Sequence, residues 1–343
     1  MQESLCGILG QDQEKLWRQV IQQAKQIREI RLRIGKPIMV RHEEGDFFLD
    51  EQGQFITDAK KAYQISGREL EDFFMRICQG SPYAFEDMLR QGFLTVSGGH
   101  RIGFAGQVVP GEDGRIRTIK HLYYVNIRIA HEILGVADSI LPHLYRQGKL
   151  QNVLIISPPG RGKTTLLREL IRKVSDGNRY GRGLNVGVVD ERSELAGAYL
   201  GCPQNDLGSR TDVLEGCPKA QGMFLLLRTM APEVLAVDEL GDSGDAEALR
   251  AAAVCGCRVM ATVHGEDWKD VNRRFPELFT QGIFEQIVLP GEPKRGEEGK
   301  YAGDRGDSDY GRQYGAWTVV PCPLYCRDTR EAVLGEDFGI VDE

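Results

Sequence analysis

The segment Ser157–Thr165, with the sequence SPPGRGKTT, constrains the fold more than any other part of the chain. It follows a short apolar run, VLIIS, and precedes a helical pattern that begins at Lys163. A strand, a glycine-containing turn and a helix in this order predict a phosphate-binding loop of the G-x-x-x-x-G-K-[ST] type. Its backbone N–H groups and the helix N-terminus would face the phosphates of a nucleotide. A glycine-rich turn that only caps a helix is the alternative interpretation.

The residue types of this loop suggest separate roles. Lys163 is expected on the β- and γ-phosphates, and Thr164 on Mg²⁺. The first glycine of the pattern is replaced by Ser157, which occupies the strand exit, where we expect a side chain to be tolerated. The predicted nucleotide-binding residues are Ser157, Pro158, Pro159, Gly160, Arg161, Gly162, Lys163, Thr164 and Thr165.

Two later apolar runs end in paired carboxylates. The run VLAVDE ends in Asp238, which suits Mg²⁺ coordination, and Glu239, which suits polarising an attacking water. The run LNVGVVDERSE carries Asp190 and Glu191, which could compete for the metal and base roles, and we rank this pair second. ATP and Mg²⁺ are therefore the expected cofactors.

A third run, RVMATVHG, ends in Thr262 and His264. Polar groups at the carboxyl end of a parallel strand face the crevice in which ligands bind. We therefore expect one of these two side chains to sense the γ-phosphate.

The apolar runs indicate two domains. Residues 1–145 combine short β-like runs with helical patterns, one of them N-capped by Ser66, and predict a mixed α+β domain. Residues 146–343 alternate continuous apolar runs with helices, which predicts a mainly parallel sheet covered on both faces. Seven of the 26 residues at 290–315 are glycine, and we expect a flexible surface loop there.

The composition narrows the class of protein. The net charge of −7 argues against a protein that coats nucleic acid. No apolar run approaches the roughly 20 residues that span a bilayer. The opening MQESLCGILG lacks the features of a secretory signal, and the eight cysteines lack zinc-site spacing. We expect a cytoplasmic protein.

The segment LRTMAPEVLAVDELGDSGDAEALRAAAVCGCRVMATVHGED resembles the core of secretion ATPases of the type II, type IV pilus and type IV secretion systems. The resemblance implies an α/β fold with a RecA-like P-loop NTPase core after a smaller mixed α+β N-terminal domain. Residues on the pattern of that family are Arg228, Pro232, Glu239, Asp242, Glu247, Thr262 and His264.

Longer stretches across the chain, among them GFLTVSGGHRIGFAGQVV, PPGRGKTTLLREL and VVDERSELAG, resemble the stage III AA family of sporulation ATPases. This resemblance implies an ATP-hydrolysing motor that energises a transmembrane channel or secretion-like complex during endospore formation. It also implies a homo-hexamer that works with membrane proteins of a sporulation channel complex. The motor would be peripheral at the membrane, on the mother-cell side.

Two further functions stay open at this stage, a nucleotide-gated scaffold with little turnover and a nucleic-acid translocase. The acidic net charge speaks against the second, and we expect no nucleic-acid partner. Arg101, Arg128 and Arg210 are candidates for an arginine that reaches the γ-phosphate, from the same subunit or from a neighbour.

Overall fold

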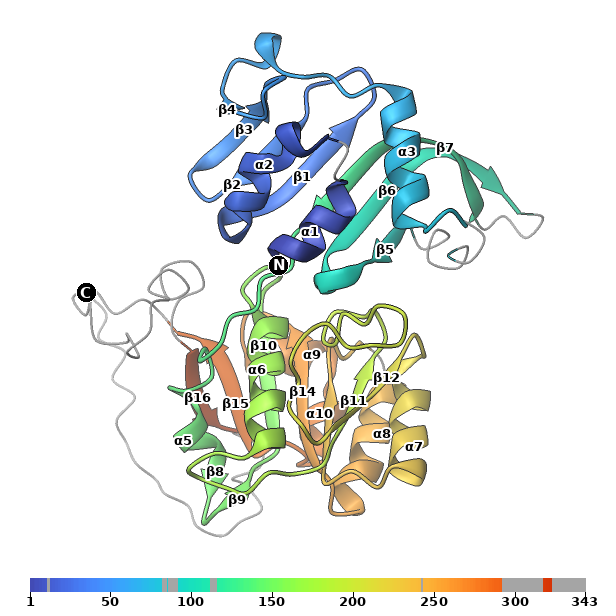
Figure 1. Ribbon diagram of the computed structural model, residues 1–343. Helices are drawn as coiled ribbons and strands as arrows, with labels where there is room; N and C mark the ends of the chain where they lie inside the picture. The colour runs from blue at the N-terminus through green and yellow to red at the C-terminus, as the bar shows by residue number, and fades with distance from the viewer. Residues whose placement is uncertain are drawn as a thin grey trace. The chain divides into compact units, whose positions relative to one another are not determined.

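The computed structural model describes residues 1–10, 13–81, 85, 92–111, 116–241, 243–291 and 317–322. The chain forms two compact units (Figure 1). The first unit contains Met1–Glu132 and Ala196–Asn205, and the second contains Ile133–Leu195 and Asp206–Glu343. Almost all of the loop predicted at 290–315 lies outside the described residues.

The first unit is built on an antiparallel sheet in the order β4-β3-β2-β1-β7-β6-β5. The strands are β1 (Ile27–Arg33), β2 (Met39–His42), β3 (Gly45–Leu49), β4 (Phe55–Ile56), β5 (Phe93–Thr95), β6 (Arg101–Pro110) and β7 (Ile116–Arg128). Its helices are α1 (Gln2–Leu9), α2 (Glu14–Gln22) and α3 (Gly67–Ile77), with 3-10 turns η2 (Ala24–Gln26), η3 (Ala59–Lys61) and η5 (Ser97–Gly99).

Apolar residues of these helices and strands form one core cluster in which Trp17, Phe73 and Ile127 are buried. The predicted N-cap Ser66 is confirmed. Its hydroxyl accepts the Glu69 N–H while the Glu69 carboxylate accepts the Ser66 N–H, so α3 begins with a reciprocal capping box.

The second unit contains a sheet in the order β12-β11-β13-β14-β10-β15-β16. Its strands are β10 (Val153–Ser157), β11 (Val186–Asp190), β12 (Thr211–Glu215), β13 (Val234–Val237), β14 (Arg258–His264), β15 (Gln286–Pro290) and β16 (Trp317–Pro321). All neighbours are parallel except β15 and β16. The mainly parallel sheet is therefore confirmed, while β12 and β15 had no counterpart in the prediction.

Helices cover both faces of this sheet because its strands are apolar on both sides (Figure 1). The helices are α6 (Lys163–Asp176), α7 (Lys219–Thr229), α8 (Ser243–Val254), α9 (Trp268–Arg274) and α10 (Glu277–Thr280). Leu154 and Ile156 of β10 share a core cluster with residues of α7, α8 and α10. Leu166 and Leu170 of α6 are also buried and lie outside that cluster, over the opposite face. A short helix α5 (Leu141–Leu144) and a hairpin of β8 (Tyr145–Arg146) and β9 (Lys149–Leu150) precede β10.

The side chains of α6 bind the connections through which the chain enters and leaves the second unit. Glu169, 3% exposed, accepts the Gly135 N–H at 2.8 Å, and Arg168 donates to the Leu195 carbonyl at 3.1 Å. Ser175 accepts the Arg210 N–H at 2.7 Å. Gly135 and Leu195 lie near the two ends of the segment Ile133–Leu195, so these hydrogen bonds hold both ends of that segment against α6.

Candidate functional site

The loop between β10 and α6 adopts the conformation that its glycines allow. Gly160 has φ 75° and Gly162 has φ 85°, values that disfavour any residue with a Cβ. Gly162 directly precedes α6, so the helix begins at Lys163 with its N-terminal N–H groups facing the loop. Ser157 ends β10, is fully buried, and donates to the Pro158 carbonyl at 3.1 Å. The strand exit thus accommodates a serine side chain.

The rest of the loop is open to solvent. Pro159, Gly160 and Arg161 are exposed, whereas Pro158 and Thr165 are half-buried. Lys163 is buried and points toward the neighbouring strand ends. A ligand at this loop would therefore meet mainly backbone groups and the ammonium group of Lys163.

The strand order explains which side chains meet Lys163. β14 lies between β10 and β13, so the carboxyl ends of all three strands are adjacent. His264 ends β14, and Glu239 follows β13. His264 is therefore placed between the other two groups.

The contacts agree with this placement. Lys163 Nζ lies 2.8 Å from His264 Nδ1, and His264 Nε2 lies 2.8 Å from Glu239 Oε1. An ammonium group only donates, so Nδ1 accepts and the ring proton resides on Nε2, which donates to Glu239. The imidazole links the cation to the carboxylate.

A second chain of contacts runs through Asp238. The Thr164 hydroxyl donates to Asp238 Oδ2 at 2.9 Å, and the Thr262 hydroxyl donates to Asp238 Oδ1. The same Thr262 oxygen accepts the Glu239 N–H at 2.8 Å. Thr262 therefore orients both carboxylates through one hydroxyl.

Burial governs the electrostatics of this group. Burial raises the pKa of Asp238, against the hydrogen bonds from Thr262 and Thr164 that lower it. Burial also lowers the pKa of Lys163, against the carboxylates of Asp238 and Glu239. Glu239 itself has φ 54°, a left-handed conformation that is costly for a residue with a side chain and is common at functional sites. The arrangement brings opposite charges and a strained backbone together at the carboxyl ends of β10, β14 and β13.

Other residues predicted for the site lie apart from this group. Glu191 follows β11 and is paired with Lys219 at 2.6 Å. Arg228 donates to the Phe224 carbonyl within α7, and that helix leads to the amino end of β13, the opposite edge of the sheet. Asp242 lies outside the described residues.

Two of the three candidate arginines belong to the first unit and one to the second. Arg101 and Arg128 are register partners on β6 and β7 of the first unit. Arg210 donates to the Ser175 carbonyl near the end of α6, far along the helix from Lys163. Two other arginines contact the group: Arg274 donates to the backbone carbonyl of His264, and Arg192 has its Nη1 3.0 Å from Glu239 Oε2. The only signal for Arg192 in the sequence was its place beside the rival carboxylates of VVDERSE.

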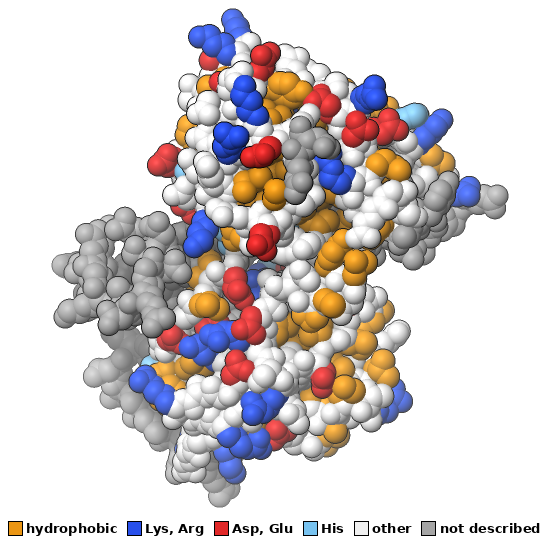
Figure 2. All heavy atoms as spheres, in the orientation of Figure 1, with side chains coloured by type: hydrophobic (Ala, Val, Ile, Leu, Met, Phe, Trp, Pro, Cys, Tyr) orange, Lys and Arg blue, Asp and Glu red, His pale blue; other side chains and the backbone are white. Residues whose placement is uncertain are grey.

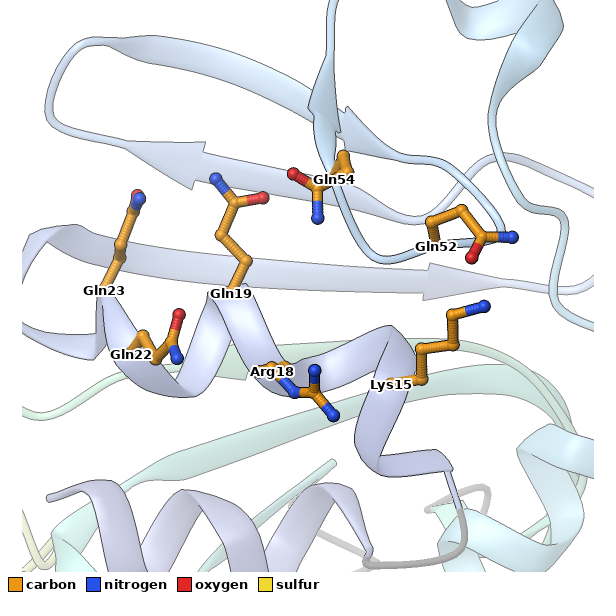
Figure 3. Close-up of a pocket in the computed structure, with 7 residues that line it drawn as sticks. All are labelled: Lys15, Arg18, Gln19, Gln22, Gln23, Gln52 and Gln54. Atoms are coloured by element: carbon orange, nitrogen blue, oxygen red, sulfur yellow. The ribbon is translucent and has the colours of Figure 1, made fainter.

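A separate hollow lies in the first unit, between α2 and the turn that carries Gln52 and Gln54 (Figure 3). Its lining is polar and contains two cations and no carboxylate: Lys15, Arg18, Gln19, Gln22, Gln23, Gln52 and Gln54. Such a lining offers hydrogen bonds but no acid–base pair. Within the described part of the chain, no three His, Cys, Asp or Glu side chains are grouped as a metal site.

Solved structures of ATPases share this fold. The pilus retraction motor PilT, solved with bound ADP, matches with a TM-score of 0.54 and 17% identity, over 82% of this chain and 80% of PilT. The ATPase DotB of Legionella pneumophila matches with a TM-score of 0.50 and 16% identity, over 78% of this chain and 73% of DotB. These similarities confirm the predicted RecA-like α/β core with a smaller mixed α+β unit before it.

The family comparison is more specific. The family model described as "Sporulation stage III, protein AA" matches residues 1–307. Stage III sporulation protein AA of Bacillus subtilis (strain 168) is 38% identical over 288 residues, which cover 83% of this chain and 87% of that protein. The chain therefore belongs to the family of sporulation stage III protein AA.

Proposed function

We propose that this protein binds and hydrolyses ATP, and that hydrolysis drives a secretion-like complex during endospore formation. The observation that carries the proposal is the joining of Lys163, His264 and Glu239 across the carboxyl ends of β10, β14 and β13. A lysine at a loop–helix junction that can bind phosphate, and a carboxylate that can accept a proton from an attacking water, are recurring groups of phosphoryl-transfer sites, and here an imidazole links the two. The family supports the sporulation context.

The residues present fit a magnesium ion. Thr164 and Asp238 offer adjacent oxygen atoms, and among the described residues the hydrogen bonds to the buried Asp238 carboxylate come from the neutral hydroxyls of Thr164 and Thr262. Mg²⁺ typically takes one or two protein oxygens and completes its shell with water and phosphate. When bound, the ion would neutralise charge on the phosphates. Thr164 and Asp238 would hold it.

The protein's own groups would perform the remaining steps. Lys163, released from His264, would bind the terminal phosphates. Glu239 would accept a proton from the attacking water as the water oxygen bonds to the γ-phosphorus. The bond from that phosphorus to the bridging oxygen would break, and ADP and inorganic phosphate would leave.

Phosphate release by the purified protein tests this proposal. The variants are Lys163→Ala, Glu239→Gln and, as the matched change after the neighbouring strand, Glu191→Gln. We expect Glu239→Gln to lower the rate about 10²–10⁴-fold while it still binds ATP. Glu191→Gln should have a much smaller effect, because Lys219 already holds that carboxylate. Equal rates in wild type and all three variants would remove the enzymatic interpretation.

We extend the proposal to assembly. A homo-hexamer in the cytoplasm would act on membrane proteins of the channel complex. Among the described residues, no helix is long and apolar enough to cross a membrane. Sedimentation of Glu239→Gln with ATP and Mg²⁺ should show the ring. ATP-dependent assembly of a wild type that never turns over, even with its partners, would instead support the nucleotide-gated scaffold.

A nucleic-acid translocase has weaker support. Figure 2 shows Lys and Arg interspersed with Asp and Glu over the visible face, rather than gathered into a stripe. Together with the net charge of −7, this distribution disfavours a path for a phosphate backbone on that face. A many-fold stimulation of hydrolysis by DNA would reverse this conclusion.

A further inference from the structure

Two arginine–glutamate pairs join β11 to β13, one at each end. Arg182 precedes β11 and pairs with Glu233, which directly precedes β13. Arg192 follows β11 and pairs with Glu239, which follows β13. The two pairs have the same chemistry, but the second lies beside the contacts of Lys163.

The backbone around Arg192 is fixed from two sides. Asp190, 1% exposed, accepts the N–H groups of Glu194 at 2.8 Å and Leu195 at 3.0 Å. Arg168 of α6 donates to the carbonyls of the same two residues. The turn that contains Arg192 is therefore held by hydrogen bonds to α6, the helix that begins at Lys163.

The side chain of Arg192, by contrast, is held weakly. It is 63% exposed, and an exposed ion pair contributes about 0–1 kcal/mol. Its partner, Glu239, has a second contact at its other oxygen, from His264. The guanidinium is thus free to exchange Glu239 for a stronger anion at little energetic cost.

We propose that Arg192 moves from Glu239 to the γ-phosphate of ATP bound to the same subunit. This inference rests on the proposed function. A water that bridges Glu239 and the γ-phosphorus puts the phosphate about two hydrogen bonds, or about 6 Å, from Glu239. A guanidinium bonded to Glu239 covers that distance by a change of its own rotamers. A phosphate offers it two charge-assisted bonds.

The move has two chemical consequences. It frees one oxygen of Glu239 to accept the proton of the attacking water. It also places a fixed positive charge on the oxygens that gain negative charge in the transition state. Because ADP lacks the γ-phosphate, only ATP would draw Arg192 from Glu239.

The test compares Arg192→Ala and Arg192→Lys with Arg182→Ala, the same change at the opposite end of the strands. Dissociation constants are measured for ADP and for a non-hydrolysable ATP analogue, each with Mg²⁺, and hydrolysis is followed in single turnover. We expect Arg192→Ala to weaken analogue binding about tenfold more than ADP binding, and to slow hydrolysis about 10³-fold or more. Arg192→Lys should restore part of the analogue affinity and part of the hydrolysis rate. Arg182→Ala should leave the two quantities unchanged.

Loss of ADP and analogue binding in equal measure would overturn the proposal, because it would show a structural role for Arg192. Unchanged analogue affinity would overturn it too, whether hydrolysis rises, falls or stays the same. Lys163→Ala separates this failure from failure of the proposed function. If Arg192→Ala binds and hydrolyses ATP like wild type while Lys163→Ala is inactive, only the role of Arg192 is rejected. A Lys163→Ala that binds and hydrolyses ATP like wild type removes the function.

Discussion

The hydroxyl of Thr164 donates a hydrogen bond to Asp238 across 2.9 Å, and so joins the first turn of α6 to the end of β13. We predict that Asp238→Asn weakens Mg²⁺-dependent ATP binding about 10–100-fold, because it removes the charged oxygen that we propose as a ligand of the ion. A fluorescent ATP analogue titrated with Mg²⁺ and with EDTA measures the effect.

Position 164 provides the matched pair for this prediction. Thr164→Ser keeps the hydroxyl, and its binding should stay within a few-fold of wild type. Thr164→Val keeps the shape without the hydroxyl and should resemble Asp238→Asn. If valine binds as well as serine, Thr164 does not hold the ion.

His264 should act as a positioning residue for Glu239. His264→Ala removes the Nε2 donor 2.8 Å from Glu239 and should lower kcat about 10–100-fold, the value of a hydrogen bond to a charged group. His264→Gln retains an N–H donor at a similar distance from the backbone and should recover part of the lost kcat. Steady-state measurement of kcat for wild type, His264→Ala and His264→Gln tests this prediction. Equal losses of kcat in the two variants would show that the hydrogen bond from Nε2 does not support catalysis.

Glu169 should matter for stability. It is 3% exposed and accepts hydrogen bonds from Gly135 and from Arg172, both at 2.8 Å. Glu169→Gln removes the charge that pairs with Arg172 and should cost about 1–3 kcal/mol. Glu266→Gln, an exposed change in the same unit, should stay within about 0.5 kcal/mol. Thermal unfolding of both variants compares them, and equal melting temperatures would contradict the prediction.

His100 should make the first unit sensitive to acid. It is 1% exposed, accepts the Ala130 N–H at Nδ1, and lies 2.9 Å from Ser4 through Nε2. Burial lowers the pKa of His100 to about 4. Because the unfolded chain, with a histidine pKa of about 6.5, binds the proton more readily, the stabilisation is complete above that pH. It is lost as the pH falls through the window down to about 4, by up to about 3 kcal/mol.

Hydrogen exchange at the Ala130 amide reports this loss locally. Protection in wild type, corrected for the intrinsic effect of pH, should fall between pH 7 and pH 5. In His100→Asn, which cannot take up the proton, protection should be lower at pH 7 but should change less over the same range. Parallel curves for the two proteins would assign the acid sensitivity to another group.

The sequence identified the strands that carry the site but not their order. VLIIS, VLAVDE and RVMATVH are apolar on both faces, and that pattern alone predicts buried parallel strands. Whether β14 lies between β10 and β13 depends on how the helices pack, which no local pattern encodes. The bridging position of His264 follows from that order, so only its presence at a strand end could be predicted.

Arg192 and β12 were missed for related reasons. β12 reads TDVLE, in which polar residues interrupt the apolar run, and it becomes a strand by pairing with β11. Arg192 looked like one charge among several in DERSE, and its contact with Glu239 needs the pairing of β11 with β13. Ser66 could be predicted because a capping box is a local device.

The helix α6 gives Lys163 a common anchor with three separate chain connections, at Gly135, Leu195 and Arg210. If the helix moves as one body over its 14 residues, a tilt at the end that carries Lys163 displaces all three connections together. These are the connections by which the chain passes to and from the first unit. We therefore expect that a phosphate bound beside Lys163 would move the three connections together, and not one of them alone.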